Sequence, residues 1–122
     1  MNEATKRILL VGDDKGDSRA LTQRLEHLGY DVISAPQEDS SALAVQDPYI
    51  DVALIDINLP IESGFRVAED LAGSSNAKVV FITSLKTSAV RSRAKALGAS
   101  GFIEKPFTSA YLKVQLEQAF AQ

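Results

Sequence analysis

Five polar side chains of the sequence follow short apolar runs, in positions where they can act on phosphate or on a metal ion. In chain order they are Asp13, Asp14, Asp56, Thr83 and Lys105. Carboxylates that converge in one crevice repel each other, and each is hard to ionise without a cation nearby. A hard divalent ion such as Mg²⁺ removes that conflict, because it accepts one or two carboxylates together with waters and a phosphate oxygen. The five residues therefore predict a phosphate or metal site, provided that the fold brings them together.

The same set contains the groups that phosphoryl transfer needs. Asp56 is the best candidate for the nucleophile, because it ends a buried apolar strand and is held rigidly there. Asp13 and Asp14 lie on a turn suited to holding a metal ion. Lys105 adds a mobile positive charge that can pair with Asp56 or with a phosphoryl oxygen, and Thr83 adds a hydroxyl donor. An acidic pair alone is most often a solvated turn or a helix cap, so the prediction depends on the combination.

Short apolar runs are the candidates for the strands that must position these side chains. They cover residues 8–11, 32–33, 52–55, 79–82 and 101–103. Unbroken apolar runs of this length indicate strands buried on both faces, as in a parallel sheet covered by helices. Between them, apolar residues recur every three or four positions, which is typical of amphipathic helices. These stripes are Leu21, Leu25 and Leu28, then Val90, Ala94 and Leu97, then Leu112, Leu116, Ala119 and Phe120, with a weaker stripe in residues 36–48 that predicts a short helix.

Capping residues agree with this division into helices. Hydroxyl and carboxylate side chains cap helix N-termini, and glycine accepts the left-handed conformation that often ends a helix. The candidates are Asp17 or Ser18 at the start of the first helix, Thr108 or Ser109 at the start of the last, and Gly29 and Gly98 at the ends of the first and fourth.

Strand and helix alternate along the whole chain, a pattern that predicts an α/β fold with right-handed crossovers. The expected architecture is a flavodoxin-like (βα)5 open parallel sheet of five strands in the order 2-1-3-4-5, with helices on both faces. Ligands of such sheets bind beyond the carboxyl ends of the strands, where the strand order reverses between the first and the third. The candidate residues follow these strand ends, so the fold is expected to gather them in one crevice.

Composition excludes several classes of protein. The chain has 122 residues, which fits one domain spanning residues 1–122. It has no cysteine and a single histidine, His27, which excludes disulfides, thiolate nucleophiles and cysteine or histidine metal clusters, and which fits a cytoplasmic location. A net charge of −3 argues against direct binding of nucleic acid. No apolar stretch approaches the ~20 residues of a membrane span, and the start of the chain does not read as a secretion signal.

Four segments, ILLVGDD, DINLPIESG, VVFITS and SGFIEKPF, resemble the signature segments of response-regulator receiver domains of two-component signal transduction. The resemblance covers nearly the whole chain. It implies that Asp56 is the phosphoacceptor and that Thr83 is the hydroxyl that swings toward the phosphate. It also implies that Lys105 is the lysine of the family, whose bond to Pro106 is commonly cis.

By the same resemblance Mg²⁺ is the cofactor, held by Asp13, Asp56 and the backbone carbonyl of Asn58. The family usually has two acidic residues directly after the first strand, and the sequence departs from this pattern at Gly12. A register without a gap places Gly12 at the first acidic position and Asp13 at the second, whereas a shift by one makes Asp13 and Asp14 the pair. We favour the first register, with Asp13 as the direct ligand and Asp14 as the alternative. Gly12 then removes one water-holding carboxylate, which would weaken metal binding.

Further positions match residues that the family uses for switching and timing. Phe102 is either the aromatic residue that turns inward on activation or an ordinary edge aromatic, and Leu85 and Asn58 match positions that tune the rate of dephosphorylation. A basic cluster on the predicted fourth helix is either a docking face for a partner or a solvated helix surface. Its members are Lys86, Arg91, Arg93 and Lys95.

The leading hypothesis is a signalling switch that accepts a phosphoryl group on Asp56 from a histidine kinase or a phosphotransfer protein and then changes its partner-binding face. Such a domain catalyses only its own phosphorylation and dephosphorylation. An output domain after residue 122, a downstream protein and a phosphorylation-dependent dimer are open alternatives for its partners. Competing hypotheses are a degenerate receiver used as a constitutive interaction module, a flavin-binding protein and an aspartate-based phosphatase. The acidic loop argues against flavin, and Asn58 stands where a phosphatase needs a second acid.

Overall fold

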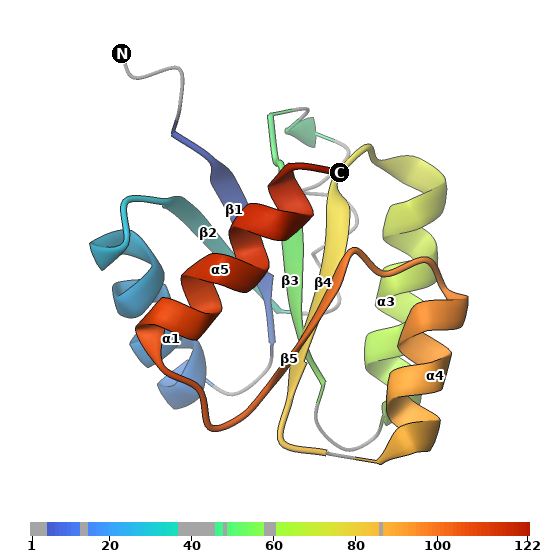
Figure 1. Ribbon diagram of the computed structural model, residues 1–122. Coiled ribbons are helices and arrows are strands. Elements are labelled where there is room, and N and C mark those ends of the chain that lie inside the picture. The colour runs from blue at the N-terminus through green and yellow to red at the C-terminus, as the bar shows by residue number, and fades with distance from the viewer. Residues whose placement is uncertain (1–4, 13–14, 37–45, 48, 58–60, 86) are drawn as a thin grey trace.

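A computed structural model describes residues 5–12, 15–36, 46–47, 49–57, 61–85 and 87–122 of the chain. These residues form a parallel five-stranded sheet in the order β2-β1-β3-β4-β5, with helices on both faces (Figure 1). The predicted α/β fold class and strand order are confirmed. The elements are β1 (Arg7–Val11), α1 (Lys15–His27), β2 (Asp31–Ala35), β3 (Val52–Ile57), α3 (Ile61–Ser74), β4 (Lys78–Thr83), α4 (Ser88–Ala96), β5 (Gly101–Glu104) and α5 (Ser109–Phe120).

Two apolar cores hold the sheet between its helix layers. Alternate residues of the central strands point to opposite faces, so that Leu9 and Ile55 join the core under α3 and α4, whereas Leu10 and Leu54 join the core under α1 and α5. Every residue of β3 is buried. Because helices cover both faces, the strands read in the sequence as unbroken apolar runs. In Figure 1, α1 and α5 lie to the left of the sheet and α3 and α4 lie to its right.

The strands extend further than the apolar runs that predicted them. β3 continues through Asp56 to Ile57, and β4 includes Thr83 as its last residue. Both polar residues were expected at or after a strand end, but they lie within the hydrogen-bonded ladder. The register pairs Ile57 with Thr83, so the polar side chains are fixed by the sheet itself rather than by a loop.

The predicted helix ends are mostly confirmed, with one error at the start of α1. Gly29 and Gly98 have φ values of 100° and 79°, which are left-handed conformations that suit glycine. The Thr108 side chain accepts a hydrogen bond from the Tyr111 amide at 3.1 Å and caps α5. The prediction that Asp17 or Ser18 caps α1 is wrong, because the helix already begins at Lys15 and both residues lie in its first turns.

Two helical segments were predicted less well. The short helix expected in residues 36–48 falls mostly outside the described residues. Helix α3 was predicted only from the alternation of strands and helices, without an apolar stripe. Phe65, Ala68 and Leu71 form such a stripe and are at most 3% exposed. In the part of the chain that the structure describes, no helix is long and apolar enough to cross a membrane.

Candidate functional site

The candidate residues meet at the carboxyl edge of the sheet. Asp56 is the next-to-last residue of β3, Thr83 is the last residue of β4, and Lys105 directly follows β5. β1 lies between β2 and β3, so the strand order reverses at this place. Parallel α/β sheets bind ligands at such a reversal. The structure therefore gathers Asp56, Thr83 and Lys105 at the edge that the sequence predicted.

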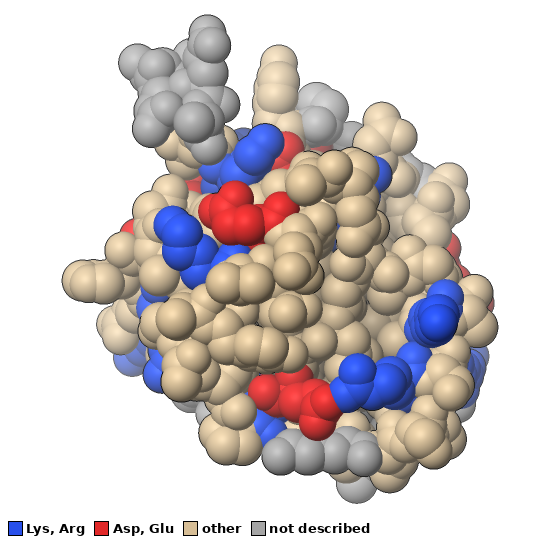
Figure 2. All heavy atoms as spheres, in the orientation of Figure 1, with Lys and Arg blue, Asp and Glu red and all other residues tan. Residues whose placement is uncertain are grey.

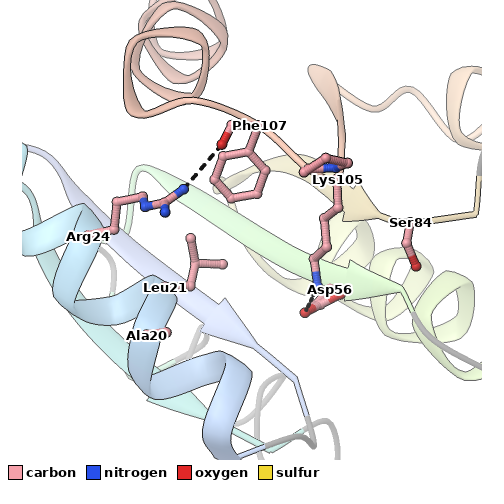
Figure 3. A pocket seen from close by; sticks show the side chains of 8 residues that line it. Ala20, Leu21, Arg24, Asp56, Ser84, Lys105 and Phe107 are labelled. Atoms are coloured by element: carbon pink, nitrogen blue, oxygen red, sulfur yellow. Dashed lines mark hydrogen bonds and ion pairs between the residues drawn. The ribbon is translucent and has the colours of Figure 1, made fainter.

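Asp56 and Lys105 form an ion pair at the centre of this edge. Lys105 Nζ donates to Asp56 Oδ2 at 2.8 Å (Figure 3). Asp56 is only 5% exposed, whereas 22% of the Lys105 side chain remains accessible. A carboxylate this deeply buried needs a charged or hydrogen-bonding partner to remain ionised, and the lysine supplies one. The lysine itself reaches the site on a flexible stem, so its charge can follow a change at the carboxylate.

Thr83 is fully buried, and its hydroxyl forms hydrogen bonds with two backbone groups. Its Oγ1 donates to the backbone oxygen of Ile57 at 2.9 Å and accepts from the amide of Leu85 at 3.0 Å. A hydroxyl has a single hydrogen to donate, so in this arrangement Thr83 cannot also donate to a group on Asp56. The Thr83 hydroxyl therefore joins β3 to the loop that leads into α4.

A pocket of about 460 Å³ opens beside the Asp56–Lys105 pair. Figure 3 shows α1 on one side of it and the segment after β5 on the other. Arg24 spans the far end, because its Nη1 donates to the Phe107 carbonyl at 3.3 Å and its guanidinium lies 5.1 Å from the Phe107 ring centroid. Nothing in the spacing of the sequence indicated this contact. The lining residues are Ala20, Leu21, Arg24, Asp56, Ser84, Lys105, Pro106 and Phe107.

Gly12 lies close to Asp56 and Ser18. A Cβ atom at Gly12 would lie 3.3 Å from Ser18 Oγ and 3.5 Å from Asp56 Cβ. No group of three or more potential acidic, histidine or cysteine metal ligands occurs among the described residues. The predicted ligands Asp13, Asp14 and Asn58 all lie outside that part of the chain. Because Mg²⁺ needs only one or two carboxylates and fills its other positions with water, the Asp56 carboxylate at this edge fits a hydrated ion.

Two basic residues of α4, Arg91 and Arg93, lie against aromatic rings. The Arg91 guanidinium is 5.1 Å from the ring centroid of Phe102, and Arg93 is 4.6 Å from that of Phe65. Arg91 also forms an ion pair with Glu104 of β5. In Figure 2, basic side chains gather over α4 beside acidic ones at the lower end of β5. These arginines are therefore not a simply solvated surface, while Lys86 of the same predicted cluster lies outside the described residues.

The resemblance attached two features to β5 and the residues after it: a cis bond before Pro106 and a switching role for Phe102. The bond between Lys105 and Pro106 is cis, as expected. Phe102 is partly buried and packs against the core under α3 and α4. Its ring is therefore neither fully inside nor free in solvent.

The chain is similar in sequence to a known domain family and to several regulatory proteins. Residues 8–117 match the family model described as response regulator receiver domain. The probable transcriptional regulator ycf27 of Pyropia yezoensis is 27% identical over 116 residues, which are 95% of this chain and 48% of that protein. The transcriptional regulatory protein YvcP of Bacillus subtilis is 35% identical over 101 residues, or 83% of this chain and 43% of that protein. The chain thus spans about half the length of the curated relatives it matches.

Solved structures of receiver domains are similar to this chain over nearly its whole length. The non-phosphorylated HemR receiver domain of Leptospira biflexa is 31% identical, with a TM-score of 0.81 and with 97% of this chain and 96% of that chain covered. The BeF3-activated N-terminal receiver domain of RstA from Klebsiella pneumoniae is 26% identical, with a TM-score of 0.85 and coverage of 96% and 100%.

Proposed function

Because the chain belongs to the family of response regulator receiver domains, we propose that it is a phosphorylation-dependent switch that carries its phosphoryl group on Asp56. The observation that carries this proposal is the ion pair of 2.8 Å between Lys105 Nζ and Asp56 Oδ2 at the carboxyl edge of the sheet. It combines a carboxylate nucleophile on a rigid strand with a cation that can follow new negative charge. We also propose that residues 1–122 form a single receiver domain.

In the proposed transfer step, an oxygen of Asp56 attacks the phosphorus atom of the donor and forms a new O–P bond. The bond from phosphorus to the donor breaks, and its electron pair stays on the leaving group. The leaving group is the imidazole nitrogen of a phosphohistidine or the carboxylate of acetyl phosphate. In hydrolysis, a water oxygen bonds to phosphorus while the O–P bond to Asp56 breaks, so that Asp56 becomes a carboxylate again and inorganic phosphate leaves with the protons of the water. The chain thus catalyses only its own phosphorylation and dephosphorylation.

Lys105 and Thr83 respond to the new charge in this proposal. Phosphorylation replaces one carboxylate charge by close to two phosphoryl charges and adds strong acceptors. The Lys105 ammonium moves from the carboxylate to a phosphoryl oxygen, and the Thr83 hydroxyl leaves the Ile57 carbonyl to donate to another. The 2.9 Å bond that holds Thr83 on Ile57 is what this movement must break.

We propose that Mg²⁺ assists this chemistry. When bound, the ion neutralises negative charge on the phosphoryl oxygens. Asp56 would hold it with Asp13 or Asp14 and with the backbone carbonyl of Asn58. A water would take the place of the carboxylate that Gly12 lacks.

For partners, we propose a histidine kinase or a phosphotransfer protein in the cytoplasm as the donor. The relatives ycf27 and YvcP carry the names of transcriptional regulators, and this chain spans only about half of each. By analogy, the switch would act on an output domain or on a separate downstream protein. A second copy of this chain, bound on phosphorylation, is a further partner to test. The net charge of −3 argues against direct binding of nucleic acid by this domain.

The deciding experiment is phosphorylation with acetyl phosphate, with and without Mg²⁺, followed by intact mass. We expect a base-labile gain of one phosphoryl group that requires Mg²⁺ and is absent in Asp56→Asn. Asp31→Asn is the matched control, because Asp31 is exposed at the opposite, amino-terminal edge of the sheet. No gain in the wild-type chain under any metal condition would favour a degenerate receiver that binds partners constitutively, and would point to Gly12 as the cause.

A further inference from the structure

The carboxyl end of β5 carries two ion pairs, from adjacent residues, on opposite faces of the sheet. Lys105 reaches Asp56 at the pocket beside α1, whereas Glu104 pairs with Arg91 of α4. Helices α1 and α4 cover opposite faces (Figure 1). A change in the partner of Lys105 therefore acts on the same short strand end that α4 holds through Glu104.

Arg91 makes a second contact with the same strand. Its guanidinium lies 5.1 Å from the ring centroid of Phe102, two residues before Glu104. Residues two apart on a strand point to the same face, so one arginine spans both side chains. We call these contacts of Arg91 with Phe102 and Glu104 the α4–β5 clamp. The side chains of Arg91 and Glu104 are 58% and 33% exposed, so the clamp can open without a large loss of buried surface.

The clamp is also joined to the Thr83 hydroxyl through the loop that precedes α4. The Leu85 amide donates to Thr83 Oγ1 at 3.0 Å, and Thr87 caps α4 by accepting from Val90 at 3.2 Å. On the other side, the Lys105 amide donates to the Thr83 backbone oxygen at 2.8 Å. A rotation of the Thr83 hydroxyl away from Ile57 therefore disturbs the entry to α4, the element that carries Arg91.

We propose that Arg91 is a positioning residue: through the α4–β5 clamp it stabilises the arrangement in which Thr83 is bound to Ile57 and Phe102 is half-buried. This inference rests on the proposed function, because it states that Arg91 influences the equilibrium between two states of that switch. The clamp is present in the state with Thr83 on Ile57, so its loss raises the population of the other state. A ligand that binds the other state better then binds the whole protein more tightly.

The first test measures amide hydrogen exchange at Leu85 without any phosphodonor. We expect exchange of the Leu85 amide to be faster in Arg91→Ala than in the wild-type chain, with a smaller increase in Glu104→Gln, which keeps the ring contact. Lys95→Ala is the matched control, because it removes one positive charge from the same helix at an exposed position. Unchanged exchange in Arg91→Ala would overturn the proposal.

The second test measures the affinity for beryllofluoride, a phosphoryl mimic, in the presence of Mg²⁺. Exposed ion pairs and ring contacts are weak, so we expect Arg91→Ala to bind about three- to tenfold more tightly than wild type, and Lys95→Ala to match wild type. Equal or weaker binding by Arg91→Ala would refute the positioning role even if Leu85 exchange is faster. If the wild-type chain binds no beryllofluoride, the proposed function fails, while the exchange test still decides whether the clamp restrains Leu85.

Discussion

The hydroxyl of Thr83 donates its one hydrogen to the backbone oxygen of Ile57, at 2.9 Å, in a fully buried position. Ile57 is the residue after Asp56, so the hydroxyl is held one residue away from the proposed phosphorylation site. It also accepts from the Leu85 amide, which makes it the link between β3 and the loop before α4. Any use of this hydroxyl at Asp56 therefore has a structural consequence at the start of α4.

Replacement of the Thr83 hydroxyl should lower stability measurably. Thr83→Val keeps the shape of the side chain but leaves the Ile57 carbonyl and the Leu85 amide without this partner. A lost buried hydrogen bond of this kind costs about 1–3 kcal/mol, and we expect the free energy of unfolding in urea to fall by about that amount. Thr83→Ser, which retains the hydroxyl, should lose less. If the valine variant is as stable as the serine variant, the hydroxyl bonds do not contribute to stability.

The Asp56–Lys105 pair should show strong coupling in a double-mutant cycle. Lys105→Met removes the ammonium and leaves a carboxylate that is 5% exposed, so we expect it to destabilise the fold. In the background of Asp56→Asn, where no charge remains to be neutralised, the same change should cost less. We expect a coupling energy of about 1–3 kcal/mol from urea unfolding of the four proteins. Additive effects would mean that the ion pair does not stabilise the buried carboxylate.

Restoration of a carboxylate at Gly12 should strengthen metal binding. A side chain at this position would lie next to Asp56 and Ser18, whose Oγ must give way slightly because it would be 3.3 Å from the new Cβ. We expect Gly12→Asp to bind Mg²⁺ about tenfold more tightly, because a second carboxylate joins the site. Without Mg²⁺ the variant should be less stable, because two carboxylates then repel each other.

Calorimetric titration with Mg²⁺ and thermal melts with and without the ion measure both effects. Gly12→Asn is the matched control, since it fills the same space without charge and should gain no affinity. Equal Mg²⁺ affinities for the aspartate and asparagine variants would contradict the assignment of Gly12 to the metal site.

The fold was predictable because its determinants are local and repeated. Helices cover both faces of the sheet, so β3 is buried along its whole length and its sequence is unbroken in apolar residues. Parallel strands then place their carboxyl ends at one edge, which was enough to predict the meeting of Asp56 and Lys105. Element ends were less predictable, since Asp56 and Thr83 continue the strands although their side chains are polar. Tertiary hydrogen bonds determine where these strands end, and those bonds cannot be inferred from the hydrophobic pattern of the sequence.

Contacts between helices and strands were not predictable in the same way. Arg24, Arg91 and Arg93 are charged residues on helix surfaces, and a sequence pattern assigns such residues to solvent. In the fold each lies over an aromatic ring, on Phe107, Phe102 and Phe65 respectively. These pairs depend on the distance and angle between packed elements, which no spacing within one helix specifies. The α4–β5 clamp therefore became visible only in the structure.

Tyr30 should make the stability of the domain depend on pH in the alkaline range. Its hydroxyl donates to Glu117 Oε1 at 2.9 Å and its ring packs against Phe120, which joins the start of β2 to α5. Burial, and secondly the hydrogen bond to Glu117, raise the pKa of Tyr30 above its ordinary value of 10.0. The folded chain therefore keeps a proton that the unfolded chain releases.

The stabilisation from Tyr30 is thus fully present below the unfolded pKa and is lost as the pH rises toward the folded pKa. We expect the free energy of unfolding to fall between about pH 9.5 and 11.5, with a Tyr30 contribution of at most about 1.4 kcal/mol per pH unit, the value for one proton. Tyr30→Phe should show a shallower slope in urea unfolding across this range. Tyr49→Phe, at a residue that is 77% exposed, should keep the wild-type slope. Equal slopes for wild type and Tyr30→Phe would show that other groups control alkaline unfolding.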